Sequence, residues 1–275
     1  MKYLSIILFA IFFATNASSQ AWTKPKGEGF YKLDYTLIQT NKVFDHTGEI
    51  VSFRTLGNHT LGFYGERGIT NKFTVQAYIP FLVRNVLNQT KGKQTGRVLE
   101  QGIASNNIGD IDIAFRYALP TGGIPVSATL LLGLPTGDSK ESSGLFTGDG
   151  EFNQMLKIST GVSKSKWWAQ GGVGFNNRTK NYSDEIRYDG EFGYKLFHEK
   201  LFTIFKLAGI ESLNNGTATA SSTGLFSNNV EYIAPGLELL YFIKPRLGLS
   251  FRSAGAVKGQ SVLAAPSFSI GVFMK

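Results

Sequence analysis

Apolar and polar residues alternate with a period of two along many short segments of this chain. Segment 110–119 is the clearest case, because its charged residues Asp110, Asp112 and Arg116 all occupy alternate positions. Successive side chains of a β-strand point to opposite sides, so the pattern predicts a strand with one apolar and one charged face. Ionised groups are costly to bury in a dry core, so the charged face must meet water. The apolar face carries Ile111, Ile113, Phe115, Tyr117 and Leu119.

The same alternation recurs in six further segments, which are 31–37, 72–81, 126–134, 187–196, 247–252 and 267–274. In a soluble sheet each apolar face would need a second layer of structure above it. In a transmembrane β-barrel the apolar face meets lipid and the polar face lines the lumen. The number of such segments favours the barrel.

The connections between these segments alternate between short and long. The short ones are 67–71, 120–123, 163–166, 197–200 and 243–246, and the long polar ones are 40–54, 84–107, 135–150, 176–185, 212–228 and 255–263. Outer-membrane barrels have short periplasmic turns and longer extracellular loops, and a β-sandwich needs no such alternation. We therefore predict an all-β fold, a transmembrane antiparallel up-and-down β-barrel of about twelve strands with both termini in the periplasm.

Two segments leave the strand register open. Segment 201–213 is apolar on both faces, and its charged residues Lys206 and Glu211 favour opposite registers. Segment 229–242 contains Pro235, which cannot donate a hydrogen bond to a ladder and indicates a bulge or an irregular stretch.

Aromatic residues concentrate at both ends of the predicted strands, on the apolar side. Near the short turns these residues are Phe73, Tyr117, Trp167, Tyr194 and Tyr241, and near the long loops they are Phe81, Phe152, Phe175, Tyr188 and Phe268. Two such bands are typical of the two membrane interfaces of a barrel. The alternative is that Phe and Tyr, with 22 and 11 copies, are simply common and β-prone. That alternative does not explain why they lie at the strand ends.

The N-terminus has the pattern of a secretory signal. Lys2 precedes a short apolar run over 4–14, and Ala17 and Ser19 occupy the positions that a signal peptidase reads. We expect cleavage after Ser19, which makes residues 1–19 a signal peptide and residues 20–275 a single outer-membrane barrel domain. The alternative is an N-terminal membrane anchor, although the run is short for a spanning helix. The expected location is the outer membrane of a Gram-negative-type bacterium.

Charged residues on the polar faces are the candidates for lining the lumen. They are Lys32, Asp34, Lys72, Asp110, Asp112, Arg116, Glu151, Lys157, Arg187, Asp189, Glu191, Lys195 and Arg252. Paired carboxylates can perform acid–base chemistry, but inward acids of a barrel usually meet inward bases. We therefore expect a wet lumen with ion pairs that sets the polarity of a pore or closes it.

The net charge of +8 agrees with contact to anionic lipid head groups, and no basic stripe with interleaved aromatics indicates nucleic acid. The expected partners are outer-membrane lipid, a small solute and the barrel-assembly machinery. Of the three histidines, His46 and His198 fall in predicted connections, and His59 has no plausible catalytic serine nearby. No His or Cys pair has metal-ligand spacing. The sequence predicts no catalytic residues, no metal and no cofactor.

Three stretches resemble one known family. They are Asn107–Tyr117, which is similar to its G-x-G-D strand, Leu132–Ser139, which is similar to its L-P-T-G-D strand end, and Tyr64–Lys72 with Tyr78–Phe81, which resemble its Y-G-I-T-D turn and the next strand. The family is the outer-membrane β-barrel group named for the MetA pathway of phenol degradation. The chain departs from the pattern at Asn107, where the first Gly is missing, and at Asn71, where Asp is common. The resemblance implies a transporter-like barrel for aromatic or hydrophobic solutes.

The expected function is a narrow outer-membrane conduit for small solutes, selected by lumen width and inward charge. A twelve-strand lumen is narrow and is filled by side chains unless small ones line it. We expect loop 135–150 to fold inward as a constriction. Two alternatives stay open, a barrel enzyme that acts on lipid and a closed barrel with a structural or adhesive role.

Overall fold

The structure, a computed structural model, describes residues 20–140, 142–218 and 225–275 of the 275-residue chain. The predicted signal peptide lies outside the described residues. The first eight strands are β1 (Gly29–Phe44), β2 (Ile50–Thr70), β3 (Phe73–Leu87), β4 (Thr90–Lys91), β5 (Val98–Glu100), β6 (Ile103–Asn107), β7 (Ile111–Leu119) and β8 (Val126–Leu134). The others are β9 (Asn153–Ser163), β10 (Trp167–Arg178), β11 (Glu185–Leu196), β12 (Leu201–Ser212), β13 (Glu231–Lys244), β14 (Leu247–Ala254), β15 (Lys258–Gln260), β16 (Val262–Leu263) and β17 (Ser267–Met274). No helix among the described residues is long and apolar enough to span a bilayer.

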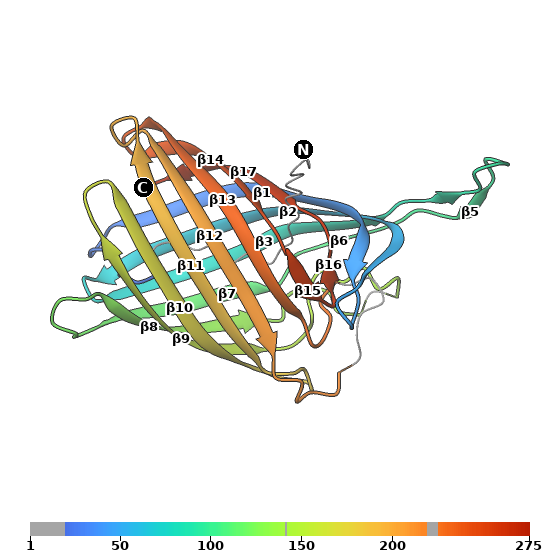
Figure 1. The fold of residues 1–275 in the computed structure, drawn as a ribbon, viewed down its shortest axis with the longest axis horizontal. Helices are drawn as coiled ribbons and strands as arrows, with labels where there is room; N and C mark the ends of the chain where they lie inside the picture. The colour runs from blue at the N-terminus through green and yellow to red at the C-terminus, as the bar shows by residue number, and fades with distance from the viewer. Residues whose placement is uncertain (1–19, 141, 219–224) are drawn as a thin grey trace, which may run out of the picture.

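The strands form a closed twelve-strand antiparallel barrel (Figure 1). Pairing follows the order β12-β11-β10-β9-β8-β7-β3-β2-β1-β17-β14-β13, and β12 pairs with β13 to close the ring. Strands β6, β15 and β16 extend the wall beyond β7, β14 and β17, while β4 and β5 form a separate protruding hairpin. All wall pairings are antiparallel, so the predicted fold class is confirmed.

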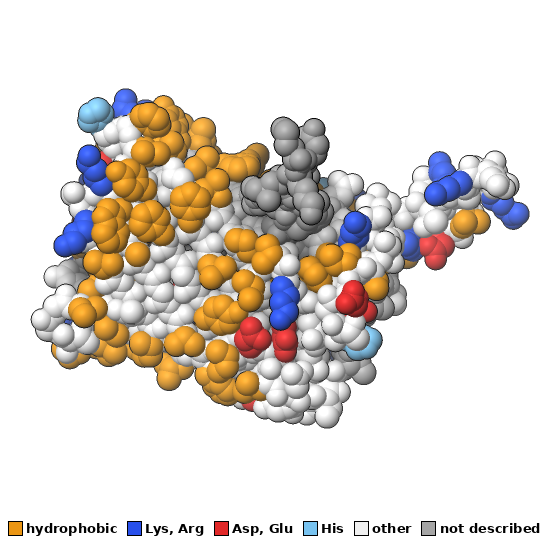
Figure 2. Space-filling model, in the orientation of Figure 1, with side chains coloured by type: hydrophobic (Ala, Val, Ile, Leu, Met, Phe, Trp, Pro, Cys, Tyr) orange, Lys and Arg blue, Asp and Glu red, His pale blue; other side chains and the backbone are white. Residues whose placement is uncertain are grey.

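The side chains alternate between lipid-side exposure and burial in the lumen. In β1, Leu33 is 47% exposed and Asp34 is 4% exposed. Figure 2 shows hydrophobic side chains spread over the barrel wall, with charged side chains toward its ends and on the β4–β5 hairpin. This sidedness follows from the pleat of each strand, since neighbouring residues point to opposite faces.

Some predicted loops contain strand, which corrects the loop boundaries. β1 and β2 run on into the predicted loop 40–54 and leave only residues 45–49 as a turn, in which the Asp45 carboxylate accepts hydrogen bonds from the Thr47 and Glu49 amides. Strand β3 likewise continues to Leu87, and β10 continues to Arg178. Hydrogen-bonded ladders stabilise these polar stretches beyond the apolar band, where composition alone predicts loops.

The structure resolves both open registers. In β12, Lys206 points into the lumen, and Glu211 points outward, where its Oε1 accepts a hydrogen bond of 3.1 Å from the Tyr188 hydroxyl. Pro235 stands in a continuous β13 opposite Leu207. The irregularity lies instead in the chain that pairs with β13. Ala254 pairs with Gly236 and Lys258 pairs with Ile233, so the stretch 254–258 has one residue more than the stretch 233–236 that it faces.

The predicted aromatic bands lie on the outer face near the strand ends. Tyr117, Tyr241 and Phe268 are well exposed, and Phe73 stacks on Phe115 with ring centroids 6.3 Å apart. Phe152 lies just before β9 rather than within a strand. Contact of these bands with the membrane interfaces stays a prediction.

Candidate functional site: the barrel lumen

The N-terminal segment 20–24 lies inside the barrel. The Ala21 amide donates to Gln170 Oε1 at 3.0 Å, and the Trp22 carbonyl accepts from Arg116 Nη1 at 3.1 Å. The Ser127 hydroxyl donates to the Gln20 carbonyl at 2.6 Å. Ala21 is buried, and Gly161 leaves the space that the Trp22 ring occupies. The segment therefore crosses the lumen and forms the floor of the space above it.

Aromatic rings fill the lumen below this floor, at the short-turn end. Phe273 stacks on Phe30 at 5.5 Å and meets Phe242 edge-on at 4.9 Å, and Phe202 lies 5.1 Å from Phe242. The Lys275 ammonium lies 4.7 Å from the centre of the Phe242 ring. These rings pack face and edge in the arrangement that aromatic quadrupoles favour.

Ion pairs occupy the lumen around the floor. Lys32 contacts Asp34 at 3.1 Å and Glu238 at 3.2 Å, and Glu238 also pairs with Lys206. Lys24 pairs with Glu66 at 3.0 Å. Inward acids thus meet inward bases, because an ionised group taken out of water needs a charged or hydrogen-bonding partner.

A cavity of about 310 Å³ lies above the floor. Gln20 lines its base. Its charged lining side chains come from β7, β9, β10, β11 and the nearby loops and are Asp110, Asp112, Arg116, Asp149, Lys157, Arg178, Glu185, Arg187 and Asp189. Its apolar lining includes Ile38, Val83, Ile210, Leu225, Phe226, Val230, Val262 and Leu263, and Ala114, Leu131 and Met155 lie among the charged side chains. The cavity therefore combines charged and apolar lining, with the charged side chains concentrated on β7 to β11 and the nearby loops.

Loop 135–152 is clamped to the long-loop end of the barrel through Asp110. The Asp110 carboxylate accepts hydrogen bonds from the Gly137 amide at 2.8 Å and from the Asp149 amide at 3.0 Å. The Thr136 hydroxyl donates to the Gly109 carbonyl at 2.7 Å, and the Thr147 hydroxyl donates to the Ile108 carbonyl at 2.8 Å. The loop therefore sits over the cavity, as the expected inward constriction requires.

Glycines in this clamp are required by close backbone approach. A Cβ on Gly137 would lie 2.7 Å from Gly148 Cα, and a Cβ on Gly148 would lie 2.2 Å from Asp110 Oδ1. Any side chain at either position would push the loop away from the barrel wall.

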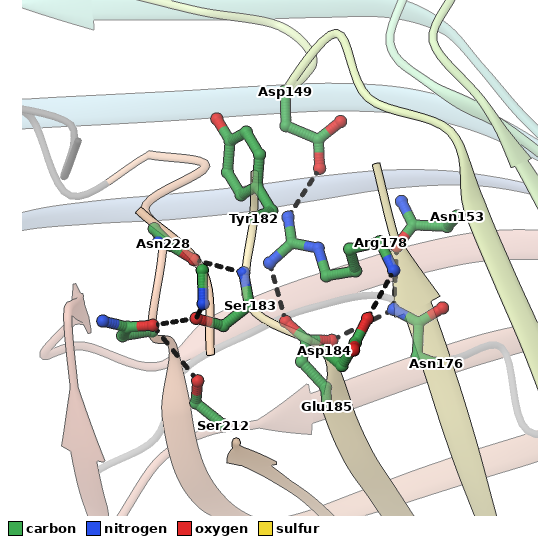
Figure 3. Close-up of polar contacts among 12 residues, drawn as sticks. Asp149, Asn153, Asn176, Arg178, Tyr182, Ser183, Asp184, Glu185, Ser212 and Asn228 are labelled. Atoms are coloured by element: carbon green, nitrogen blue, oxygen red, sulfur yellow. Dashed lines mark hydrogen bonds and ion pairs between the residues drawn. The ribbon is translucent and has the colours of Figure 1, made fainter. Parts of the chain in front are cut away.

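Arg178 joins the loop to the wall at the same end (Figure 3). Its guanidinium contacts Glu151 at 2.8 Å, Glu185 at 2.8 Å and Asp149 at 3.0 Å, and it lies over the Tyr182 ring at 4.4 Å. Three carboxylates converge on this one planar group, which presents enough donors to satisfy all of them.

An apolar cluster completes the roof. Leu145 from the clamped loop, Leu225 and Val230 from the loop before β13, and Val262 with Leu263 are all buried together. The Ser183 amide donates to Asn228 Oδ1 at 2.8 Å, which ties the loop before β13 to the Arg178 region (Figure 3). The long-loop end is thus covered by three segments that pack on one another.

Burial, followed by the nearby Asp149 carboxylate, raises the pKa of the Asp110 carboxyl to about 7, although the two bound amides oppose this. Burial and Asp149 also raise the pKa of Glu151. The hydrogen bond from Asn215 lowers the pKa of Asp184, which lies at the surface of the same region. The clamp therefore contains one carboxyl group, that of Asp110, whose pKa lies near neutrality.

Most of the predicted lumen residues face inward, and several meet in ion pairs. Lys157 pairs with Asp189, Glu191 accepts a hydrogen bond from Trp168 Nε1 at 2.6 Å, and Arg252 is buried. Asp110 and Glu151 lie in connections and not on a strand, so they belong to the roof.

The prediction for Lys72 is wrong. Lys72 is exposed in the two-residue turn between β2 and β3, where the alternation of the strand no longer applies. Lys195 lies close to the turn 197–200, and its ammonium pairs with Glu199 at 2.9 Å.

The sequence patterns did not predict that Arg178, Glu185, Glu66 and Glu238 are buried charged residues of the lumen. The alternation of residues 62–68 could have predicted that Glu66 points inward, because Glu66 lies two positions after the inward Tyr64. Arg178 and Glu185 fell within a predicted loop, so no pattern marked their direction.

The three histidines lie in different parts of the structure. His59 faces outward and its Nδ1 lies 2.6 Å from the Tyr35 hydroxyl, while His46 and His198 lie in turns. Within residues 20–140, 142–218 and 225–275, no group of three His, Cys, Asp or Glu side chains is placed to hold a metal ion.

The sequence matches the family described as "Putative MetA-pathway of phenol degradation" over residues 24–265. The chain belongs to this family. The stretches that carry its motifs, 107–110 and 134–138, form the clamp between β7 and loop 135–152.

Solved structures of outer-membrane barrels are similar in fold. The COG4313 outer membrane channel from Pseudomonas putida F1 is 12% identical, with a TM-score of 0.64 over 94% of this chain and 98% of that chain. The KdgM porin in complex with disordered oligogalacturonate is 9% identical, with a TM-score of 0.50 over 89% of this chain and 98% of that chain. No curated protein matches the sequence. The chain therefore has the fold of an outer-membrane β-barrel.

Proposed function

We propose that this barrel is a narrow conduit that passes small, largely apolar or aromatic solutes across the outer membrane and performs no chemistry on them. The observation that carries this proposal is the cavity of about 310 Å³ inside the lumen, between the floor at Gln20 and the roof of loops. A cavity with an apolar side and a few polar groups is what small-molecule sites usually offer. The name of the family and the barrel fold support the same function.

The surroundings of the barrel follow from this proposal. The exposed apolar band faces outer-membrane lipid, and after cleavage of residues 1–19 the barrel-assembly machinery inserts the chain. Ion pairs in the lumen set its polarity, so width and charge, and not a reaction, determine which solutes pass.

Passage of a neutral aromatic solute into vesicles tests the proposal. Ala208 lines the cavity from β12, whereas its neighbour Leu207 points outward. Ala208→Phe fills part of the cavity, so we expect the entry rate of phenyl β-glucoside, a neutral aromatic solute that crosses a bare bilayer slowly, into proteoliposomes to fall by roughly fivefold or more. Leu207→Phe is the matched control and should leave the rate unchanged. Equal rates for wild type and protein-free vesicles would contradict the proposal.

A second candidate, a closed structural barrel, is favoured by one observation. Segment 20–24 and the rings of Phe30, Phe202, Phe242 and Phe273 occupy the short-turn end of the lumen. A closed barrel predicts no solute entry in the same vesicles, so one experiment separates the two functions.

A further inference from the structure

Asp112 differs from the other charged side chains that line the cavity. Each of the others has a partner: Lys157 pairs with Asp189, Arg187 with Glu185, and Asp110 accepts two amides. Arg116 and Arg178 are likewise held, by Glu66 and by three carboxylates that include Asp149. Asp112 has no hydrogen bond and no ion pair to any residue that the structure describes. Arg187 acts on it electrostatically but contacts Glu185, so Asp112 is a lumen carboxylate without a direct partner among the described residues.

The surroundings of Asp112 leave room for a ligand. Its cross-strand neighbour on β8 is Gly133, which has no side chain, and its inward neighbour along β7 is Ala114. Tyr78 is its neighbour on β3 and also lines the cavity. The Asn153 side chain lies over Gly133, so the carboxylate faces the cavity between Asn153, Ala114 and the Tyr78 ring.

The wall across the lumen combines apolar side chains with Arg187, which is the cross-strand neighbour of Ile210. In the twelve-strand ring β13 stands six strands from β7, which places it on the opposite side. Ile210 of β12, Tyr232 of β13 and Val230 line the cavity there. A solute that spans the cavity would have a polar head at Asp112 and an apolar body against this wall.

The charge balance favours a cationic head. The lining carries five acidic and four basic side chains, and two of the acids, Asp110 and Asp112, contact none of these cations. Two amides hold Asp110, which leaves Asp112 without a direct partner. Arg187 on β11 acts on Asp112 electrostatically, but its Nε and Nη2 both contact Glu185 Oε2 at 2.7 Å. A carboxylate withdrawn from bulk water gains most from a partner that carries positive charge and donates hydrogen bonds.

We propose that the cavity binds small amphipathic solutes with a primary ammonium head and an aromatic or aliphatic body, and that Asp112 is the residue that selects the head. A cavity of this size has room for about ten water-sized groups, which matches a ring with a short aminoalkyl arm. This inference rests on the proposed conduit, because the same cavity serves both.

Three probes that share one ring and differ in the head test the inference: benzylammonium, benzyl alcohol and benzoate. Binding to the purified protein in detergent is measured by saturation-transfer NMR, with empty micelles subtracted. We expect benzylammonium to bind about tenfold or more tighter than benzoate, with benzyl alcohol between them. Equal affinities, or no binding of any probe, would overturn the inference.

Variants locate the effect. Asp112→Asn keeps the shape and removes the charge, so the preference for benzylammonium over benzoate should fall by about tenfold. Glu211→Gln removes one negative charge from the outer face of the barrel and should leave the preference intact. A preference that survives Asp112→Asn would assign it to another group and refute the role of Asp112.

The conduit is tested separately by phenyl β-glucoside entry into proteoliposomes. Entry without an Asp112-dependent preference would leave the conduit standing and refute this inference. An Asp112-dependent preference without entry would support this inference and refute the conduit, since binding would then occur in a closed barrel.

Discussion

The two ends of the lumen are filled by opposite chemistries. At the long-loop end, Asp110 and Arg178 fasten loop 135–152 over the cavity with charged hydrogen bonds. At the short-turn end, rings such as Phe242 and Phe273 pack on one another beneath segment 20–24. A charged clamp depends on protonation and on each partner being present, whereas stacked rings depend on shape and buried area. The roof is therefore the end of this barrel that conditions can open, and the floor is the end that packing fixes.

The largest expected effect comes from removal of Arg178. Arg178→Ala removes the cation that Asp149, Glu151 and Glu185 share, so that only Glu185 keeps a partner, Arg187. Loss of one partner of a buried ion pair costs roughly 3–5 kcal/mol. We expect the amides of loop 135–152 to exchange hydrogen much faster, measured by mass spectrometry. Arg246→Ala, in the exposed turn before β14, is the control for loss of one arginine. Unchanged exchange in the loop would show that Arg178 does not hold the roof.

A smaller effect is expected from pH. The pKa of Asp110 is raised to about 7, so the folded clamp binds a proton more readily than the unfolded chain. Between the ordinary pKa of an aspartate and about 7, the stability of the clamp therefore falls as pH rises. Glu151 acts in the same direction because its pKa is also raised.

Hydrogen exchange of loop 135–152, corrected for the intrinsic pH dependence of exchange, measures this response. Protection should be severalfold higher at pH 5 than at pH 8, and Asp110→Asn should remove most of the difference. The short-turn end should not respond in this range. Equal protection at both pH values in the wild type would refute the titration of the clamp.

Much of the wall could be predicted from the sequence, because its pattern is local. β7 shows why: lipid on one side and a wet lumen on the other impose a period of two, so Asp112 and Arg116 are placed by counting from Phe115. Lys72 shows the limit, because counting fails at a turn. Register in β12 was open for the same reason, since Glu211 finds a partner, Tyr188, outside the lumen.

The roof and the floor could not be predicted in the same way. Arg178 acts through Asp149, Glu151 and Glu185, and these contacts depend on how two loops fold over the rim. Segment 20–24 contacts Arg116, Ser127 and Gln170, which are distant in sequence, and it carries no periodic pattern. Both features are tertiary, and single-segment patterns contain no information on them.

Single-channel conductance in planar bilayers, of the chain that begins at Gln20 and of a chain that begins at Pro25, tests the central claim most directly. The claim is that solutes travel through the lumen and that segment 20–24 narrows this path. The account predicts a small conductance for the first chain and one about threefold or more larger for the second, with unchanged β-sheet circular dichroism. Equal conductances, or no conductance from either folded chain, would contradict it.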